Sequence, residues 1–152
     1  MMKRALSRSE YVSLSRFLRV ESLPPQLVFI ESGKKVRCAT RAALETAAQM
    51  KGLVTVGIYA AKKIGDEYYL SVEGSQLLGP YMEGGVVEVS MSEAEEWMRG
   101  APLKKEPPDS DIAVVKLDWL YLGSGKVSRD GKIYPLIPKE RMISSSRSRA
   151  TR

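Results

Sequence analysis

The chain has 152 residues, in which 24 Lys and Arg against 18 Asp and Glu leave a formal net charge of +6. It contains no histidine and one cysteine, which excludes Ser-His-Asp and Cys-His catalysis, His-ligated zinc, a thiolate zinc cage and an intrachain disulfide framework. With 43% hydrophobic and 28% charged residues it is typical of a globular protein, long enough for one domain or two small ones.

The first half alternates helical and β-type patterns. Tyr11, Leu14 and Leu18 recur at helical spacing. Pro24 and Pro25 end that segment, because proline lacks a backbone donor and constrains the residue before it. In chain order the patterns predict a helix over 7–19, strands over 27–30 and 36–39, a helix over 40–50, a hairpin of strands over 53–64 and 68–72, and a helical turn opened by Ser75.

Glycines and a proline at residues 79–85 break the pattern and indicate a domain boundary. Beyond it, Ser92 with Glu95 three residues later is typical of a capping box, and Arg99-Gly100 ends the short helix that follows. The patterns then predict a strand over 86–89, that helix, an irregular loop over 101–110, strands over 112–117, 120–127 and 132–137, and a disordered basic tail over 144–152. We therefore expect an α+β fold of two domains.

The net charge is distributed unevenly along the chain. Residues 1–51 hold ten basic and four acidic side chains, residues 52–110 hold five and ten, and residues 111–152 hold nine and four. Two basic ends on one face would attract phosphate backbones by counterion release. The alternative is a mildly basic protein with no polyanionic partner.

Catalytic and metal-binding candidates are few. Cys38 lies in a predicted strand with no histidine to activate it, so we expect a buried apolar side chain. Asp109 and Asp111 could chelate a hard cation, but beside two prolines they are expected to form a solvated loop. We therefore expect no catalytic residue, no metal and no cofactor.

Two further patterns have structural explanations. The first-turn position of the glutamates at 93, 95 and 96 is explained by the helix dipole and the cap. Gly123-Ser124-Gly125 resembles part of a phosphate loop, but no helix follows it, so a bulge or a close approach of another backbone or a ligand is expected there.

Basic residues of the last segment alternate with Tyr121 and Tyr134, an arrangement that suits phosphate contacts plus base stacking on single-stranded or irregular nucleic acid. The alternative is a solvated sheet edge, since lysines also protect edges from aggregation. Trp97 and Trp119 are expected in the core or at a domain interface. The candidate phosphate-binding residues are Lys116, Lys126, Arg129, Lys132, Lys139 and Arg141.

The second half resembles a PUA domain, the small RNA-binding pseudo-barrel of pseudouridine synthases and archaeosine transglycosylases. The resemblance is carried by "VVEVSMSEAEEWMRGAPL" at 86–103, "DIAVVKLDWLYLGSGKV" at 111–127 and "DGKIYPLIPKERMI" at 130–143. It implies that Arg99, Gly100 and the loop after them border an RNA groove. Pro102 and Lys104-Lys105 stand where the family commonly has an acidic residue and another glycine.

The first half is similar to the domain that precedes PUA in ribosome biogenesis factors of archaea and eukaryotes and in the C-terminal region of Sun-type RNA cytosine methyltransferases. "FIESGKKVRCATRAALE" and "GLVTVGIYAAKKIGDEYYLSVEGSQLL" carry this similarity. The resemblance implies a pre-PUA-like α/β domain over 1–82, a PUA-like domain over 83–143 and a tail over 144–152. Neither a Gly-rich S-adenosylmethionine loop nor a Pro-Cys dipeptide is present, so it implies the binding half of such systems.

Charge and resemblance together predict a non-enzymatic protein that binds structured rRNA or tRNA during ribosome biogenesis or RNA modification. Its further partners would be ribosome-assembly proteins or an RNA-modifying enzyme. The alternative is a protein-binding adaptor, or the targeting subunit of such an enzyme. No apolar run approaches the roughly 20 residues of a membrane span and no signal-peptide core follows Lys3-Arg4, so we expect no membrane partner and a cytoplasmic location.

Overall fold

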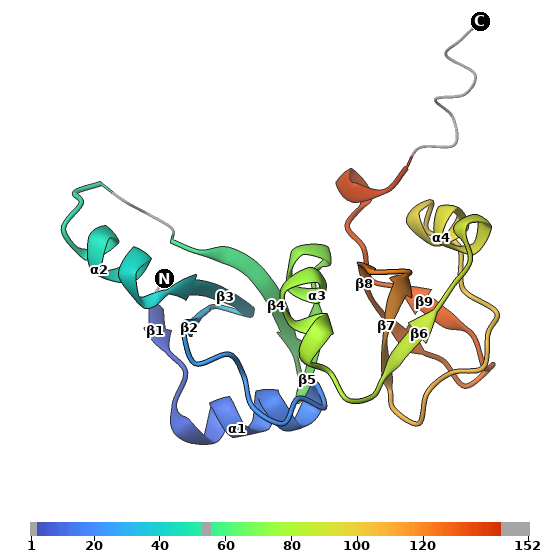
Figure 1. Cartoon of the computed structure of the whole chain (residues 1–152), viewed down its shortest axis with the longest axis horizontal. Helices are drawn as coiled ribbons and strands as arrows, with labels where there is room; N and C mark the ends of the chain where they lie inside the picture. The colour runs from blue at the N-terminus through green and yellow to red at the C-terminus, as the bar shows by residue number, and fades with distance from the viewer. Residues whose placement is uncertain (1–2, 53–55, 144–152) are drawn as a thin grey trace, which may run out of the picture.

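The computed structural model describes residues 3–52 and 56–143, which form two β-sheets and several short helices (Figure 1). The strands are β1 (Lys3–Ala5), β2 (Leu27–Ser32), β3 (Lys35–Thr40), β4 (Ile58–Ile64), β5 (Glu67–Leu70), β6 (Val86–Glu88), β7 (Ile112–Leu117), β8 (Leu120–Val127) and β9 (Ile133–Pro135). The helices are α1 (Arg8–Phe17), α2 (Arg41–Ala48), α3 (Val72–Leu78) and α4 (Met91–Met98), with 3-10 turns η1 (Gly79–Tyr81) and η2 (Lys139–Arg141).

The two sheets use separate halves of the chain. The first has strand order β1-β2-β3-β4-β5 and is antiparallel throughout. The second has the order β6-β7-β8-β9, in which β6 and β7 run parallel. The mixed α+β architecture is therefore as expected. No helix in the described ranges is long and apolar enough to cross a membrane.

Helix α1 packs against the first sheet. A capping box begins it: Glu10 N donates to Ser7 Oγ at 3.2 Å, and Ser7 N donates to Glu10 Oε1 at 2.9 Å. Leu14 and Leu18 are buried with Phe29 in the core of this half. The helical spacing that predicted this element therefore marks its buried face.

Helix α3 begins before the position that the sequence predicted. Its N-cap is Ser71 and not Ser75: the Ser71 hydroxyl accepts a hydrogen bond from Gly74 N at 2.9 Å. Because β5 ends at Leu70, Ser71 is the first residue after the strand, and its backbone (φ −70°, ψ 173°) has the extended conformation that an N-cap requires. Ser75 instead lies fully buried inside the helix.

Helix α4 also begins earlier than predicted. The capping box is formed by Ser90 and Glu93, not by Ser92 and Glu95. Ser90 has the extended backbone of a cap (φ −82°, ψ 172°), whereas Ser92 already lies in the first turn. Two serine-glutamate pairs with the same spacing follow one another here, and the point at which β6 ends selects the first of them.

The two tryptophans differ in burial. Trp97 is 1% exposed, and its Nε1 donates to Leu122 O at 2.8 Å. A Cβ on Gly125 would come within 2.5 Å of the Trp97 ring, so glycine is what allows the ring to lie against β8. Trp119 is 81% exposed, and the expectation that it would be buried is wrong. It stands at the tip of the two-residue β7–β8 turn, next to Asp118 at φ +54°.

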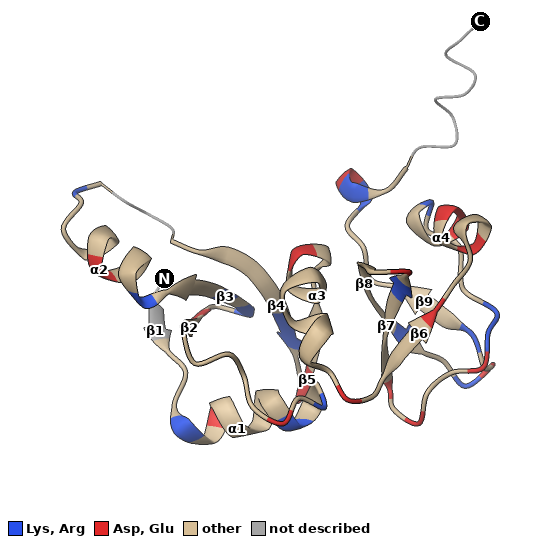
Figure 2. Cartoon of the chain, in the orientation of Figure 1, with Lys and Arg blue, Asp and Glu red and all other residues tan. Residues whose placement is uncertain are grey.

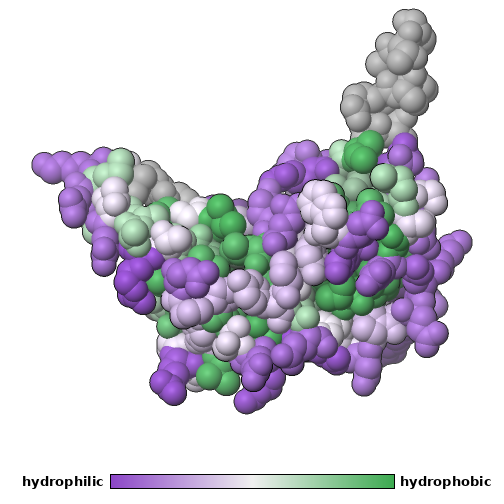
Figure 3. Space-filling view, in the orientation of Figure 1, coloured by the Kyte–Doolittle hydropathy of each residue, from purple (hydrophilic) through white to green (hydrophobic). Residues whose placement is uncertain are grey.

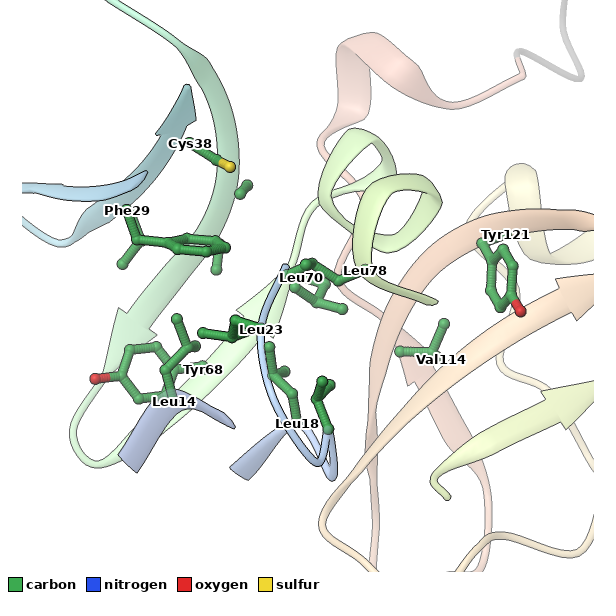
Figure 4. Close-up of a cluster of buried hydrophobic side chains, with 14 residues drawn as sticks. Leu14, Leu18, Leu23, Phe29, Cys38, Tyr68, Leu70, Leu78, Val114 and Tyr121 are labelled. Carbon is green, nitrogen blue, oxygen red and sulfur yellow. The ribbon is translucent and has the colours of Figure 1, made fainter. Parts of the chain in front are cut away.

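Helix α3 joins the two halves. Gly123 N on β8 donates to Ser75 Oγ at 2.8 Å, and Ser124 Oγ donates to Leu70 O at 2.8 Å. Tyr121 of the second half belongs to the same buried cluster as Leu70 and the core of the first half (Figure 4). The division into domains at 82/83 stays a prediction, and the tail at 144–152 lies outside the described residues.

We predict that Gly74→Ala destabilises the protein severely. An added Cβ at this position would lie 1.9 Å from Ala60 O, a backbone atom that cannot move away without displacing β4. The expected loss in the free energy of unfolding is about 3 kcal/mol, measured by urea denaturation.

Gly84→Ala is the matched control. Its Cβ would meet the flexible Arg19 side chain at 3.1 Å, and Gly84 does not have a positive φ. The expected loss is below about 1 kcal/mol. Equal losses from the two variants would contradict the close contact at Gly74.

Candidate nucleic-acid interface

The chain after β9 returns to the end of α4. Ile143 N donates to Met98 O at 2.7 Å. Met142 packs on Gly100, where the φ of +97° favours glycine and an added Cβ would lie 3.0 Å from the Met142 sulfur. This return places four predicted RNA-binding residues on two neighbouring segments: Arg99, Gly100, Lys139 and Arg141.

Two of these four already have acidic partners. Arg99 lies 3.4 Å from Glu96, one turn earlier on α4. Arg141 forms an ion pair with Glu73 in the first turn of α3, which links the C-terminal segment to the helix between the halves. Figure 2 shows acidic residues in red at the start of α3 and both blue and red at η2. Lys139 is exposed and has no ion pair within the described part of the chain.

The β8–β9 hairpin presents three more predicted residues, and Asp130 shapes its turn. The carboxylate accepts hydrogen bonds from Lys132 N at 2.9 Å and from the Tyr134 hydroxyl at 2.7 Å. These bonds hold the pKa of Asp130 below its usual value and raise the pKa of Tyr134. Lys126 lies 3.4 Å from Glu67 of β5, and Arg129 is exposed at the turn.

Lys116 lies apart from these residues. It pairs with Tyr121 across the β7–β8 hairpin, and its ammonium is 5.4 Å from the centre of the Tyr121 ring. Lys126 lies five positions after Tyr121 on β8, or about 16 Å along the strand. Tyr121 is 8% exposed, so it is no platform for a base, whereas Tyr134 is 39% exposed. The six basic residues therefore do not form one cluster.

A second basic surface lies on the first sheet, where the sequence analysis named no site. Lys35 on β3 stands directly opposite Lys62 on β4, and Arg37 stands opposite Tyr59. The register shifts between Val36 and Arg37, so β4 has one extra residue in this stretch. Because side chains alternate along a strand, this bulge turns Tyr59 to the same face as Lys62. The Lys35 ammonium is 5.0 Å from the centre of the Tyr59 ring, in agreement with that geometry.

Ser71 satisfies the backbone groups that the bulge frees. Its hydroxyl donates toward the carbonyls of Tyr59 at 2.6 Å and Ala60 at 3.2 Å, and its own N–H donates to Ala60 O at 3.0 Å. A serine that caps α3 therefore also fixes the strand that carries Tyr59. The first turn of α3 is thereby placed beside the basic face of the first sheet.

A groove of about 500 Å³ runs over this first turn, between the first sheet and the C-terminal segment. Figure 3 shows the molecule hollowed on this side between its two halves. Neither Lys35 nor Lys62 has an ion pair among residues 3–52 and 56–143. Burial raises the pKa of the Tyr59 hydroxyl. The charged and aromatic side chains that line the groove are Lys35, Tyr59, Lys62, Glu73, Glu140 and Arg141.

The sequence contains part of the signal for this groove. Lys35 and Arg37 alternate with apolar Val36 and Cys38, which is typical of a strand with one polar face. The partner strand and its bulge are not visible in that alternation, because register depends on pairing between distant residues. Of the eight predicted residues, the structure places Arg141 in the groove and Lys139 beside it.

No family model matches the chain, and no curated protein matches its sequence. The molecule does share its fold with PUA-domain proteins among the solved structures. The expected PUA-like fold is thus confirmed for the chain, and its assignment to residues 83–143 stays a prediction. The similarity of the first half to the domain that precedes PUA in ribosome biogenesis factors and Sun-type methyltransferases stays a prediction.

Two of these structures illustrate the likeness. One is a PUA domain from Aeropyrum pernix K1, crystallised as a tartrate complex, with a TM-score of 0.51 and 17% identity over 91% of this chain and 86% of that one. The other is a conserved PUA domain protein from Thermoplasma acidophilum, with a TM-score of 0.53 and 15% identity over 94% and 93%.

We predict that Cys38 is unreactive in the folded protein. It is buried, as expected from the sequence, and burial raises the pKa of its thiol to about 11. Because only the thiolate attacks, iodoacetamide at pH 8 should modify native Cys38 about a hundredfold more slowly than the same residue in urea-unfolded chain. Comparable rates, followed by mass spectrometry, would contradict a purely structural cysteine.

Proposed function

We propose that this protein is a non-catalytic, cytoplasmic RNA-binding protein that acts on structured rRNA or tRNA during ribosome biogenesis or RNA modification. The PUA-like fold supports this proposal, since the resemblance that the sequence carries is to RNA-binding domains. Among the described residues, no group of three or more His, Cys, Asp and Glu side chains is placed to hold a metal.

One observation carries the proposal. Exposed basic side chains project from two parts of the second half of the chain, the β8–β9 turn and the C-terminal segment. Arg129 and Lys139 are both exposed, and neither has an ion pair within residues 3–52 and 56–143. Unpaired cations gain the most when phosphates replace their solvent counterions.

We predict that Arg129→Ala and Lys139→Ala each weaken RNA binding regardless of RNA sequence. Each variant removes about one phosphate contact, so the slope of log Kobs against log salt should fall in magnitude by about one. Filter binding over a salt series measures this slope.

Lys51→Ala is the control for lost charge. Lys51 is exposed and follows α2, which lies at the opposite end of the molecule from β9 (Figure 1). Its slope should equal that of the wild type. Affinity that stays flat as salt rises would show the phosphate contacts to be wrong. Crosslinking in cells, with sequencing of the attached fragments, then identifies the RNA and its processing step.

A second candidate function is a protein-binding adaptor or targeting subunit in a ribosome-assembly or RNA-modification complex. It is favoured by exposed apolar side chains near one end of the second sheet: Trp119 is 81% exposed and Met91 is 63% exposed. Val89 N donates to Lys116 O at 2.9 Å, so the start of α4 and the β7–β8 turn lie at the same end. Aromatic residues are enriched at the centres of protein interfaces.

RNA retained by the purified protein distinguishes the two candidates. The RNA-binding proposal predicts excess absorbance at 260 nm after purification at low salt, which ribonuclease treatment removes. The adaptor hypothesis predicts no excess, together with loss of complex formation in Trp119→Ala. Catalytic activity that arises only after mixing with a separate methyltransferase or synthase would indicate a targeting subunit.

A further inference from the structure

Two exposed lysines stand opposite one another on central strands of the first sheet. Lys35 and Lys62 are directly paired, and like charges in such pairs destabilise a sheet. Lysines commonly protect exposed sheet edges, but β3 and β4 lie between β2 and β5, so neither strand is an edge. Glu73 is already paired with Arg141, and Glu140, which also lines the groove, forms no ion pair with either lysine within the described residues. The lysines therefore form a like-charge contact that a bound anion would relieve.

An aromatic ring lies beside this lysine pair. Tyr59 is half-buried and lines the same groove, to which the bulge in β4 turns it. Its hydroxyl stays protonated at neutral pH, since burial raises its pKa. The ring is thus a neutral, positioned surface on which a base can stack, and base–aromatic stacking contributes about 1–3 kcal/mol.

The shape of the groove selects the form of the nucleic acid. The ring lies in a hollow whose far side is formed by Pro138 and Arg141 of the C-terminal segment. In a duplex the bases are stacked on one another and their faces cannot reach such a ring. An unpaired base can enter while its phosphates stay near Lys35 and Lys62.

We infer that this groove binds a single-stranded segment of RNA, with Lys35 and Lys62 on its phosphates and a base against Tyr59. The first sheet then holds the RNA together with the PUA-like half. This inference rests on the proposed function and names the part of the RNA and the part of the protein that meet.

The test compares neighbouring residues on opposite faces of β4. Lys62 points into the groove, whereas the ammonium of Lys63 lies 5.7 Å from the centre of the Tyr68 ring in the core face of the strand. We predict that Lys62→Gln weakens binding of a fluorescent decauridine about fivefold to tenfold, while Lys63→Gln changes it less than twofold. Fluorescence anisotropy on the full chain measures both.

The Tm of the RNA-free protein tests the repulsion between Lys35 and Lys62 independently of binding. Relief of the like-charge pair should raise the Tm of Lys62→Gln by about 1–3 °C, so a gain in stability accompanies the loss of binding. Lys63→Gln should not raise the Tm. A lowered Tm in Lys62→Gln would contradict the repulsive pair and overturn the inference.

The stacking contact is tested with Tyr59→Leu and Tyr59→Phe. Loss of the ring should weaken decauridine binding about tenfold, whereas Phe keeps the ring and should keep the affinity. If Tyr59→Leu does not fold, the decauridine affinities of Lys62→Gln and Tyr59→Phe still test whether the groove binds RNA. A blunt-ended RNA duplex of the same charge should bind the wild type more weakly than decauridine, and its binding should be unaffected by Tyr59→Leu.

The outcomes separate this inference from the proposed function. Wild-type decauridine affinity in Lys62→Gln, together with weakened RNA binding in Arg129→Ala and Lys139→Ala, would overturn the groove and leave the function standing. Equal effects on duplex and single strand would overturn the selection of unpaired RNA. A wild-type protein that binds no RNA at low salt would overturn both.

Discussion

The groove depends on the contact between helix α3 and the bulge in β4. Gly74 lies so close to Ala60 O that a methyl group would not fit between them, and Ser71 supplies hydrogen bonds to the carbonyls of Tyr59 and Ala60. A bulge that left these buried carbonyls unpaired would cost about 1–3 kcal/mol for each group. Ser71 and Gly74, at the start of α3, therefore stabilise the bulge in β4 that orients Tyr59 toward the groove.

The opposite side of α3 holds the second half in a fixed position. Ser75 accepts from Gly123 N, and Gly79 lies against the ring of Tyr121, where a larger side chain would clash. Small residues thus permit close packing on both sides of one short helix, and the buried hydroxyls of Ser71, Ser75 and Ser124 all have hydrogen-bond partners. Because the walls of the groove come from the two halves, its width follows from these contacts and not from a flexible linker.

Local signals predicted much of the fold. The apolar spacing in 7–19, the hairpin predicted for 53–72 and the strands predicted for 112–117 and 120–127 each correspond to elements that are present. The predictions failed where two serines competed for one cap, because the choice depends on where the preceding strand ends. Strand β1 was also missed, since three residues carry too little pattern to be distinguished from a loop. The groove was not predicted because the pairing of Lys35 with Lys62 joins residues 27 positions apart.

The charge arrangement is more informative about function than the fold or the net charge. A likeness at 15–17% identity establishes a shared fold, and the residues of a binding surface can change completely within one fold. A net charge of +6 is compatible with simple solubility. The pairing of Lys35 with Lys62 on interior strands is different, because like charges directly opposite one another destabilise a sheet and edge protection does not require them there. The lysine pair lowers the stability of the free protein and lies next to the Tyr59 ring in the groove. Such a combination is expected where binding of an anion determines which residues occupy these positions.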